Sequence, residues 1–371
     1  MGYKNIKIID RTLRNVDPAL AKNFMPWILK HPRSIYTMIR LARGYKKSCK
    51  IRAEENLEGL TVPPFLILSI TSNCNLECTG CYAAATENLC KQSSKPSLNL
   101  DDWERIIQEA SDLGVFGFIL AGGEPFLMLN LLRLCEKFHE RLFLIVTNGT
   151  AIRDQDFKRL KRLKNVVVMV SIEGDQETTD KRRGEGVHEQ ANATLNRLEQ
   201  NGVLSGISAT ITRSNFRYWM DSKNIDDLIS KGVRLAFLLE YIPIDNNTEL
   251  MLSEDESFEL REIILKYRRN KPIFIIHSPG DEENFGGCVS AGRGFAHVTP
   301  LGDLTACPVS NVATHNLTKS SLKDGLNCDL FKIIRENEQL LETNGSPCAL
   351  FSHSNELHEL LKETKVYKTK I

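Results

Sequence analysis

The sequence lacks any hydrophobic run that approaches the roughly 18 consecutive apolar residues needed for a membrane-spanning helix. No secretory signal is indicated either, because the first residues (MGYKNIKIIDRTLRN) carry charges throughout. The formal net charge is only +1, and no spacing of basic and aromatic residues favours a nucleic acid as partner. We therefore expect a folded, cytoplasmic protein that does not bind nucleic acid.

Cysteine, in contrast, is abundant, with ten residues in a chain of 371. Cytosolic thiols stay reduced, so this number favours metal binding or catalysis over a disulfide framework. Three thiols lie close together, and four are spread over the C-terminal quarter: Cys74, Cys78 and Cys81, then Cys288, Cys307, Cys328 and Cys348. The other three are most simply core or surface thiols: Cys49, Cys90 and Cys135.

The first 60 residues form a distinct basic segment. They contain 13 Lys and Arg residues against 5 Asp and Glu, whereas acidic residues outnumber basic ones in the rest of the chain. Behind the capping residue Ser34, an apolar face recurs at helical spacing: Ile35, Met38, Ile39 and Ala42. We predict a helical arm that packs against the acidic body. A surface for acidic lipid head groups, with peripheral membrane contact, or for an acidic substrate is the alternative.

From residue 64 onward, apolar runs alternate with helical patterns. The predicted strands cover residues 65–71, 117–121, 142–147, 166–171, 207–211 and 235–242. The predicted helices cover residues 100–113, 127–139, 154–163, 188–201 and 225–231. Six such units in a row indicate an α/β fold whose parallel sheet curls into a partial (β/α)6, TIM-like barrel.

The chain is predicted to have four parts. The helical arm comprises residues 1–60 and the barrel residues 61–245. A connecting helix and strand occupy residues 246–280, and a small extension of a β-hairpin and a helix occupies residues 281–371. The barrel is therefore the part in which we look for a site.

Polar loops, most of them glycine-rich, follow the predicted strands. They read AGGEP at residues 121–125, TNG at 147–149, SIEG at 171–174 and TRSN at 212–215. The carboxyl ends of parallel strands form the face on which α/β barrels build active sites. Glu240 and Tyr241, at the end of the sixth strand, should line the same pocket. The loop SNCNLECTGC follows the first strand, which places its three thiols at this face.

Three closely spaced thiolates on one loop can hold three irons of a 4Fe-4S cluster and leave the fourth iron without a protein ligand. The open iron is then available for chemistry. Zinc is the alternative, but a structural zinc site needs four ligands, and the next candidate is Cys90, across a polar loop.

Four motifs occur in order along the predicted barrel: CNLECTGC after the first strand, GGEP after the second, SIEG after the fourth, and DKRRG at residues 180–184. Over residues 62 to about 245, this pattern resembles the radical S-adenosylmethionine (radical SAM) enzymes. One position departs from the family pattern. Many members have an aromatic residue just before the third cysteine, where this chain has Gly80, with Tyr82 after the cysteine instead.

The resemblance implies a catalytic cluster on Cys74, Cys78 and Cys81, with S-adenosylmethionine chelating the open iron. Further cofactor contacts would come from the loops, with Arg182 an alternative to Arg183: Tyr82, Gly122, Gly123, Glu124, Pro125, Asn148, Ser171, Glu173, Arg183 and Thr212. An electron from a donor such as flavodoxin or ferredoxin would cleave the S–C5′ bond. The resulting 5′-deoxyadenosyl radical would take a hydrogen atom from a peptide or small-molecule substrate.

The C-terminal segment resembles the auxiliary-cluster extension of such enzymes, called SPASM or, in its shorter form, twitch. It contains Cys288, a predicted hairpin with its turn at residues 300–303, and then Cys307 and Cys348. The resemblance implies one auxiliary 4Fe-4S cluster on these three thiols, which would accept an electron or ligate the substrate. Cys328 is either the fourth ligand or a buried thiol on a helix.

Two other functions stay open from the sequence. One is an iron–sulfur electron-transfer or scaffold protein without S-adenosylmethionine chemistry. The other is a radical SAM enzyme that acts on a lipid or membrane-associated substrate through its basic arm. The loops at residues 121–125 and 171–174 favour an enzyme, because an electron carrier has no need of them.

Overall fold

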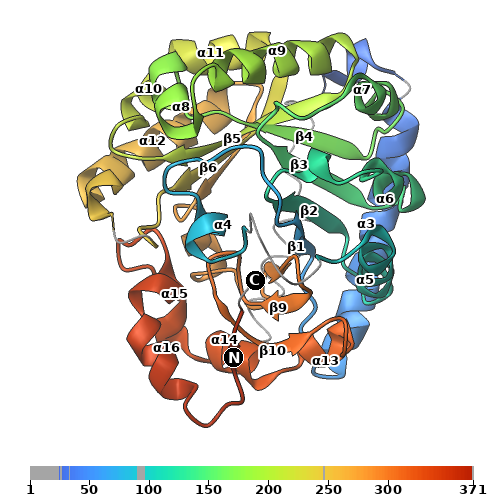
Figure 1. Cartoon of the computed structure of the whole chain (residues 1–371), viewed down its shortest axis with the longest axis vertical. Helices are drawn as coiled ribbons and strands as arrows, with labels where there is room; N and C mark the ends of the chain where they lie inside the picture. The colour runs from blue at the N-terminus through green and yellow to red at the C-terminus, as the bar shows by residue number, and fades with distance from the viewer. Residues whose placement is uncertain (1–24, 26, 33, 90–96, 245–246, 370–371) are drawn as a thin grey trace.

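A computed structural model describes residues 25, 27–32, 34–89, 97–244 and 247–369. The first 24 residues of the predicted arm, and Cys90, lie outside this range. The described strands form one sheet in the order β11-β10-β9-β8-β1-β2-β3-β4-β5-β6-β7. The sheet curves around an interior, with helices on its outer side (Figure 1). Since β11 and β7 are its edges, the described sheet is a partial barrel, as predicted.

The strands are β1 (Phe65–Thr71), β2 (Gly117–Gly122), β3 (Leu142–Thr147), β4 (Val166–Ser171), β5 (Leu204–Ile211), β6 (Val233–Glu240), β7 (Phe274–Ser278), β8 (Phe295–Val298), β9 (Asp303–Thr305), β10 (Val312–Asn316) and β11 (Tyr367–Lys368). All six predicted strands are present. A seventh parallel strand, β7, follows them and pairs with β6. It extends the barrel beyond the six units that the sequence predicts.

The α-helices are α3 (Ser34–Leu57), α4 (Tyr82–Ala85), α5 (Leu100–Asp112), α6 (Leu132–Lys137), α7 (Asp154–Leu160), α8 (Gln176–Arg183), α9 (Val187–Gln200), α10 (Phe216–Met220), α11 (Ser222–Ser230), α12 (Glu254–Asn270), α13 (Leu322–Leu326), α14 (Asp329–Glu336), α15 (Ala349–Ser352) and α16 (Ser354–Leu360). Short 3-10 helices include η1 (Pro125–Leu127) and η3 (Glu282–Phe285). The helix predicted at residues 127–139 is much shorter, because Leu127 ends η1, a turn follows, and α6 begins only at Leu132. Among the described helices, none is long and apolar enough to cross a membrane.

The two sides of the sheet bury different sets of side chains. In β4, Val166 and Val168 join the large core between the sheet and the outer helices. Val167 and Met169 belong to a smaller apolar cluster on the inner side. Because strand residues alternate between faces, Ser171 belongs to the inner set. The predicted site residue therefore lies on the side of the sheet that faces the barrel interior.

The C-terminal hairpin is part of the barrel sheet. β8 runs parallel to β1 and antiparallel to β9. The fully buried His297 joins them, with Nε2 2.8 Å from Ser69 Oγ and Nδ1 2.8 Å from Thr305 Oγ1. Burial lowers the pKa of His297 to about 3, so the imidazole is neutral. Thr305 Oγ1 in turn donates to the carbonyl oxygen of Cys307 (3.1 Å), which links the first strand to the C-terminal cysteines.

The prediction that the apolar residues of the arm helix form its buried face is wrong. Ile35 and Ile39 are each 47% exposed, whereas α3 buries small and polar residues such as Gly44. A Cβ on Gly44 would lie only 2.5 Å from the carbonyl oxygen of Glu140. The helix packs so closely to its neighbours that only small side chains fit, and Arg52 at its far end donates to Gly114 O (2.5 Å). The buried face of α3 is therefore the one whose small residues allow the helix to lie close to its neighbours, and it does not follow the apolar periodicity.

Candidate active site

Cys74, Cys78 and Cys81 lie on the loop between β1 and α4, and all three are partly exposed. Burial raises the pKa of the Cys74 thiol, and the negative charges of the other two thiolates raise it further. Burial also raises the pKa of Cys78, although the cations Arg183 and Arg182 oppose this shift. The thiols are thus close enough to repel one another as thiolates, and binding to a cationic centre would relieve this repulsion.

The GGEP loop rests directly on the cysteine loop. Gly123 N donates to Thr71 O and Glu124 N to Asn73 O, both at 2.8 Å. A Cβ on Gly123 would lie 2.0 Å from Asn73 O, and Gly122 has a φ of +114°. Gly122 is therefore favoured by its backbone conformation, and Gly123 by the close contact between the second loop and the cysteine loop, which leaves no space for a Cβ.

The side chain of Glu124 connects the second loop to the third. Its carboxylate is 1% exposed and accepts hydrogen bonds from Phe126 N (3.0 Å), Thr147 Oγ1 (2.7 Å) and Asn148 N (2.8 Å). Burial raises the pKa of Glu124, and these three donors oppose the shift. The carboxylate is occupied by the protein, which leaves the backbone of this loop as the part that can contact a ligand.

The TNG loop also contacts the cysteine loop. Asn148 Nδ2 donates to Asn75 Oδ1 (2.9 Å), and Asn75 Nδ2 donates to Thr150 Oγ1 (2.8 Å). Asn75 lies between the first two cysteines of the motif. Asn148, predicted as a cofactor contact, therefore has a second role that the sequence did not indicate, which is to hold the segment between Cys74 and Cys78.

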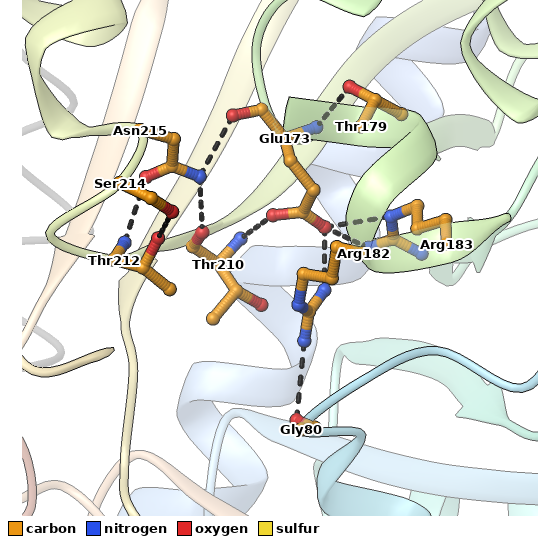
Figure 2. A network of polar contacts seen from close by, with 9 residues as sticks. All are labelled: Gly80, Glu173, Thr179, Arg182, Arg183, Thr210, Thr212, Ser214 and Asn215. Carbon is orange, nitrogen blue, oxygen red and sulfur yellow. Dashed lines mark hydrogen bonds and ion pairs between the residues drawn. The ribbon is translucent and has the colours of Figure 1, made fainter. Parts of the chain in front are cut away.

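The fourth loop contributes an ion-pair network centred on Glu173, which is fully buried (Figure 2). Its carboxylate accepts from Arg182 (2.6 Å), from Arg183 Nε (2.7 Å) and from Thr210 N (2.9 Å). Although burial opposes ionisation, the two guanidinium groups and the Thr210 bond lower the pKa of Glu173 below its usual value. Both Glu173 and Arg183, predicted as cofactor contacts, are thus paired with each other.

The same network reaches the cysteine loop through Arg182. Its guanidinium donates to Gly80 O (3.3 Å) (Figure 2). In addition, Thr79 N donates to Arg182 O (2.8 Å). Sequence reasoning weighed Arg182 only as a competitor of Arg183. Its function in bracing the segment between Cys78 and Cys81 depends on contacts between α8 and the cysteine loop, for which the sequence carries no local signal.

Gly80, at the position where the sequence departs from the family pattern, leaves room for an aromatic ring from elsewhere. Its φ is +65°, and a Cβ there would lie 2.9 Å from Cε2 of the buried Tyr241. Tyr82 faces the second loop, since its hydroxyl accepts a backbone hydrogen bond from Gly122, and burial raises its pKa. Both tyrosines thus flank the cysteine loop.

Two further residues predicted to line the site bond to other groups of the protein. Thr212 is buried, and its hydroxyl is 2.8 Å from Ser214 Oγ. Its backbone N donates to the side-chain oxygen of Asn215 (Figure 2). Glu240 was expected to line the pocket, but its carboxylate bonds to His277 Nε2 (2.9 Å) and to a serine of α12 on the outer side of the sheet. Glu240 therefore holds β6, β7 and α12 together instead.

The C-terminal cysteines fall into two groups. Burial and the charges of Cys348 and Cys288 raise the pKa of Cys307, so these three lie near one another. Cys328, which directly precedes α14, interacts electrostatically with Arg335 instead. Among the described residues, no group of three His, Cys, Asp or Glu side chains is placed so that it could hold a metal ion. A cubane cluster spreads its ligands over separate irons, and three neighbouring thiols on each site suit such a cluster chemically.

Comparison with known proteins agrees with this geometry. Residues 68–215 match the family model described as the Radical SAM superfamily. This part of the chain, which carries the three-cysteine loop and the first five strands of the barrel, is therefore similar to that superfamily, and the relatives described next include a named synthase and a named maturation protein.

Two curated relatives are Fe-coproporphyrin III synthase of Methanosarcina barkeri and the sporulation killing factor maturation protein SkfB of Bacillus subtilis. The first is 29% identical over 53% of this chain and 48% of its own length, the second 25% identical over 71% and 64%. The chain thus spans about half of the synthase and less than two thirds of SkfB. Streptococcus suis SuiB, solved with its precursor peptide SuiA bound, has the same fold, with a TM-score of 0.65, 20% identity and coverage of 82% of this chain and 74% of SuiB.

Proposed function

We propose that the protein is a radical SAM enzyme that modifies a peptide, with a catalytic 4Fe-4S cluster on Cys74, Cys78 and Cys81. The observation that supports this most strongly is the bracing of the cysteine loop. The GGEP loop, the TNG loop and the Glu173 network each bond to a different part of it. An electron carrier needs only the thiolates, whereas a site for a cofactor needs the surrounding loops held at fixed distances.

When bound, the cluster would supply one electron to cleave S-adenosylmethionine, and the 5′-deoxyadenosyl radical would remove a hydrogen atom from the substrate. The chain's own residues have the supporting roles. Gly122 and Gly123 let the backbone approach the cofactor, and the cations Arg182 and Arg183 favour the thiolate form of Cys78. The partly exposed Leu239 and the inner apolar cluster would face the substrate and limit access of water.

A peptide substrate is supported by the relatives. SkfB is named a maturation protein, a mycobacterial relative that is 26% identical is named the mycofactocin maturase MftC, and SuiB has been solved with a precursor peptide. An auxiliary cluster on Cys288, Cys307 and Cys348, accepting an electron or ligating the substrate, completes the proposal. A flavodoxin or ferredoxin would supply the electron to the first cluster.

The decisive test is anaerobic reconstitution with iron and sulfide, followed by dithionite and S-adenosylmethionine. The expected result is 5′-deoxyadenosine, measured by chromatography and mass spectrometry, together with methionine. A fully loaded protein that forms none would favour the iron–sulfur electron carrier instead. Adding candidate precursor peptides and measuring a mass change in them would then test the substrate class separately.

Replacing Gly123 with Ala is expected to weaken cofactor binding at least tenfold. The new methyl group would overlap Asn73 O, so the second loop must move away from the cysteine loop, at a cost of about 1–3 kcal/mol in unfolding free energy. Calorimetric titration of S-adenosylmethionine into reconstituted protein would measure the affinity. Gly59→Ala is the control, because no atom lies within 4 Å of its new Cβ and any strain from the positive φ of Gly59 acts away from the site. Equal affinities of the two variants for S-adenosylmethionine would contradict the role assigned to Gly123.

A further inference from the structure

The exposed side of α3 combines apolar and basic side chains. In its first two turns, Tyr36 is 72% exposed, and Ile35 and Ile39 are each 47% exposed. The next turns add four exposed basic side chains: Arg43, Lys46, Lys47 and Lys50. On a helix with 3.6 residues per turn, these seven positions lie within about 120° of one another. They form one continuous surface, which we call the arm face.

The positive charge of the arm face is largely uncompensated. Residues 34–53 contain six Lys and Arg and no Asp or Glu. Within the described part of the chain, Lys50 is the one basic residue of the arm face that forms an ion pair, with the exposed Glu54 (3.7 Å). The first 24 residues of the sequence carry five Lys and Arg against two Asp, so they have a net charge of the same sign. The exposed apolar side chains therefore adjoin a strongly basic surface.

α3 crosses the end of the barrel that lies opposite the cysteine loop. Arg52 donates to Gly114 O (2.5 Å), shortly before β2, and the helix lies directly against Glu140 O, shortly before β3. Just before α3, His31 packs against Gly202, which precedes β5. These segments lie at the amino ends of parallel strands, whereas the three cysteines follow the carboxyl end of β1. Because α3 buries its other side against these segments, the arm face points away from the candidate active site.

A membrane surface with anionic lipids is the partner that fits this combination. Apolar side chains of a surface helix enter the head-group region, while neighbouring Lys and Arg side chains attract the anionic lipids. The guanidinium of Arg40 lies 5.8 Å from the centre of the Tyr36 ring, and such amphipathic side chains are typical of the boundary between lipid and water. A single helix face is convex and offers no groove for an extended peptide. A second copy of the chain would bring four like charges to each side of the contact, which disfavours that pairing.

We propose that the arm face binds membranes that contain anionic phospholipids and holds the protein with its cysteine loop turned toward the aqueous phase. The contact is peripheral, because α3 lies along the lipid surface with one face. In this orientation the candidate active site receives its substrate from solution and not from the bilayer beneath α3. The proposal does not depend on the catalytic activity proposed above.

Co-sedimentation of the full chain with vesicles tests the binding. We expect binding to vesicles of phosphatidylglycerol and phosphatidylcholine in equal parts, release at high salt, and no binding to phosphatidylcholine alone. Lys46→Glu combined with Lys47→Glu should weaken binding by at least about tenfold, because cations close to an anionic membrane contribute strongly to affinity. Ile35→Ser combined with Ile39→Ser should also weaken it, because the apolar contact is lost.

The matched control is Lys266→Glu combined with Arg269→Glu. It changes the net charge by the same amount at two exposed positions of α12, on the opposite side of the molecule from α3 (Figure 1). Binding to the anionic vesicles should be kept. Circular dichroism of all variants checks that the fold is unchanged, as expected for exposed positions.

Quenching by lipids that are brominated on their acyl chains tests the orientation. A tryptophan introduced by Tyr36→Trp should be quenched when vesicles bind, whereas one introduced by Glu177→Trp should not, because α8 follows the carboxyl end of β4. The native Trp27, Trp103 and Trp219 are buried and give a common background. Equal loss of binding in the Lys46 variant and the α12 control, or quenching only at Glu177→Trp, would overturn the proposal. So would a chain that ignores anionic vesicles but forms dimers through the arm face.

Discussion

Replacing Cys74, Cys78 and Cys81 together with Ala is expected to abolish 5′-deoxyadenosine formation and to remove the iron of the first cluster, while the fold remains. The thiols are partly exposed and lie outside the hydrophobic core, so their loss opens no cavity there. The barrel strands bury their side chains independently of this loop. Iron analysis, the assay for cofactor cleavage and circular dichroism of the same preparations would measure the three effects.

Cys90→Ala is the control for this experiment. Cys90 is the residue that a four-ligand zinc site would need, and the cluster proposal gives it no role. It should therefore keep both iron and activity. Cofactor cleavage that persists in the triple variant would show that the reactive site is elsewhere, and loss of metal in Cys90→Ala would favour zinc.

Replacing Glu173 with Gln should destabilise the protein by about 3–5 kcal/mol, because it leaves the two mostly buried guanidinium groups of Arg182 and Arg183 without a counter-charge. Since Arg182 also bonds to Gly80 O, the cysteine loop should loosen and the first cluster should be lost more rapidly. Chemical denaturation would measure the free energy of unfolding, and the decay of the cluster's absorbance in air would measure its lability. The exposed Glu177, on α8 together with the two arginines, offers Glu177→Gln as a matched control that should change neither.

The same carboxylate predicts a dependence on pH. The pKa of Glu173 is lower in the folded protein than its usual value of 4.5, so the unfolded chain binds more protons in the interval between the two. The stabilisation is therefore fully present above about pH 4.5 and is lost as the pH falls through the lower, folded value. Unfolding measured across this range should show a steeper acid dependence for the wild type than for Glu173→Gln. If the free energy of unfolding depended on pH equally in the two proteins, this would contradict the role assigned to the ion pairs of Glu173.

The barrel could be predicted from the sequence because its signals are local. A buried parallel strand is a short apolar run between turn residues, and three of the six predicted strands have the predicted bounds: β1, β3 and β4. The seventh strand, β7, has the same apolar character, but no polar glycine-rich motif marks it as part of the barrel. The buried face of α3 could not be predicted, because it depends on the close approach of Gly44 to Glu140 O, a contact between distant segments.

By itself, the sequence determined the fold class, the position of three thiols after the first strand and the order of the loops that follow the next strands. These features are carried by residues adjacent in the chain, where periodicity and spacing are enough. Only the tertiary structure decided the partners of those residues. Glu173 pairs with two arginines, and Tyr241 occupies the space that Gly80 leaves. Side-chain hydrogen bonds and charge pairs form between whichever groups the folded backbone brings within about 3 Å, and residue order along the chain does not encode that proximity.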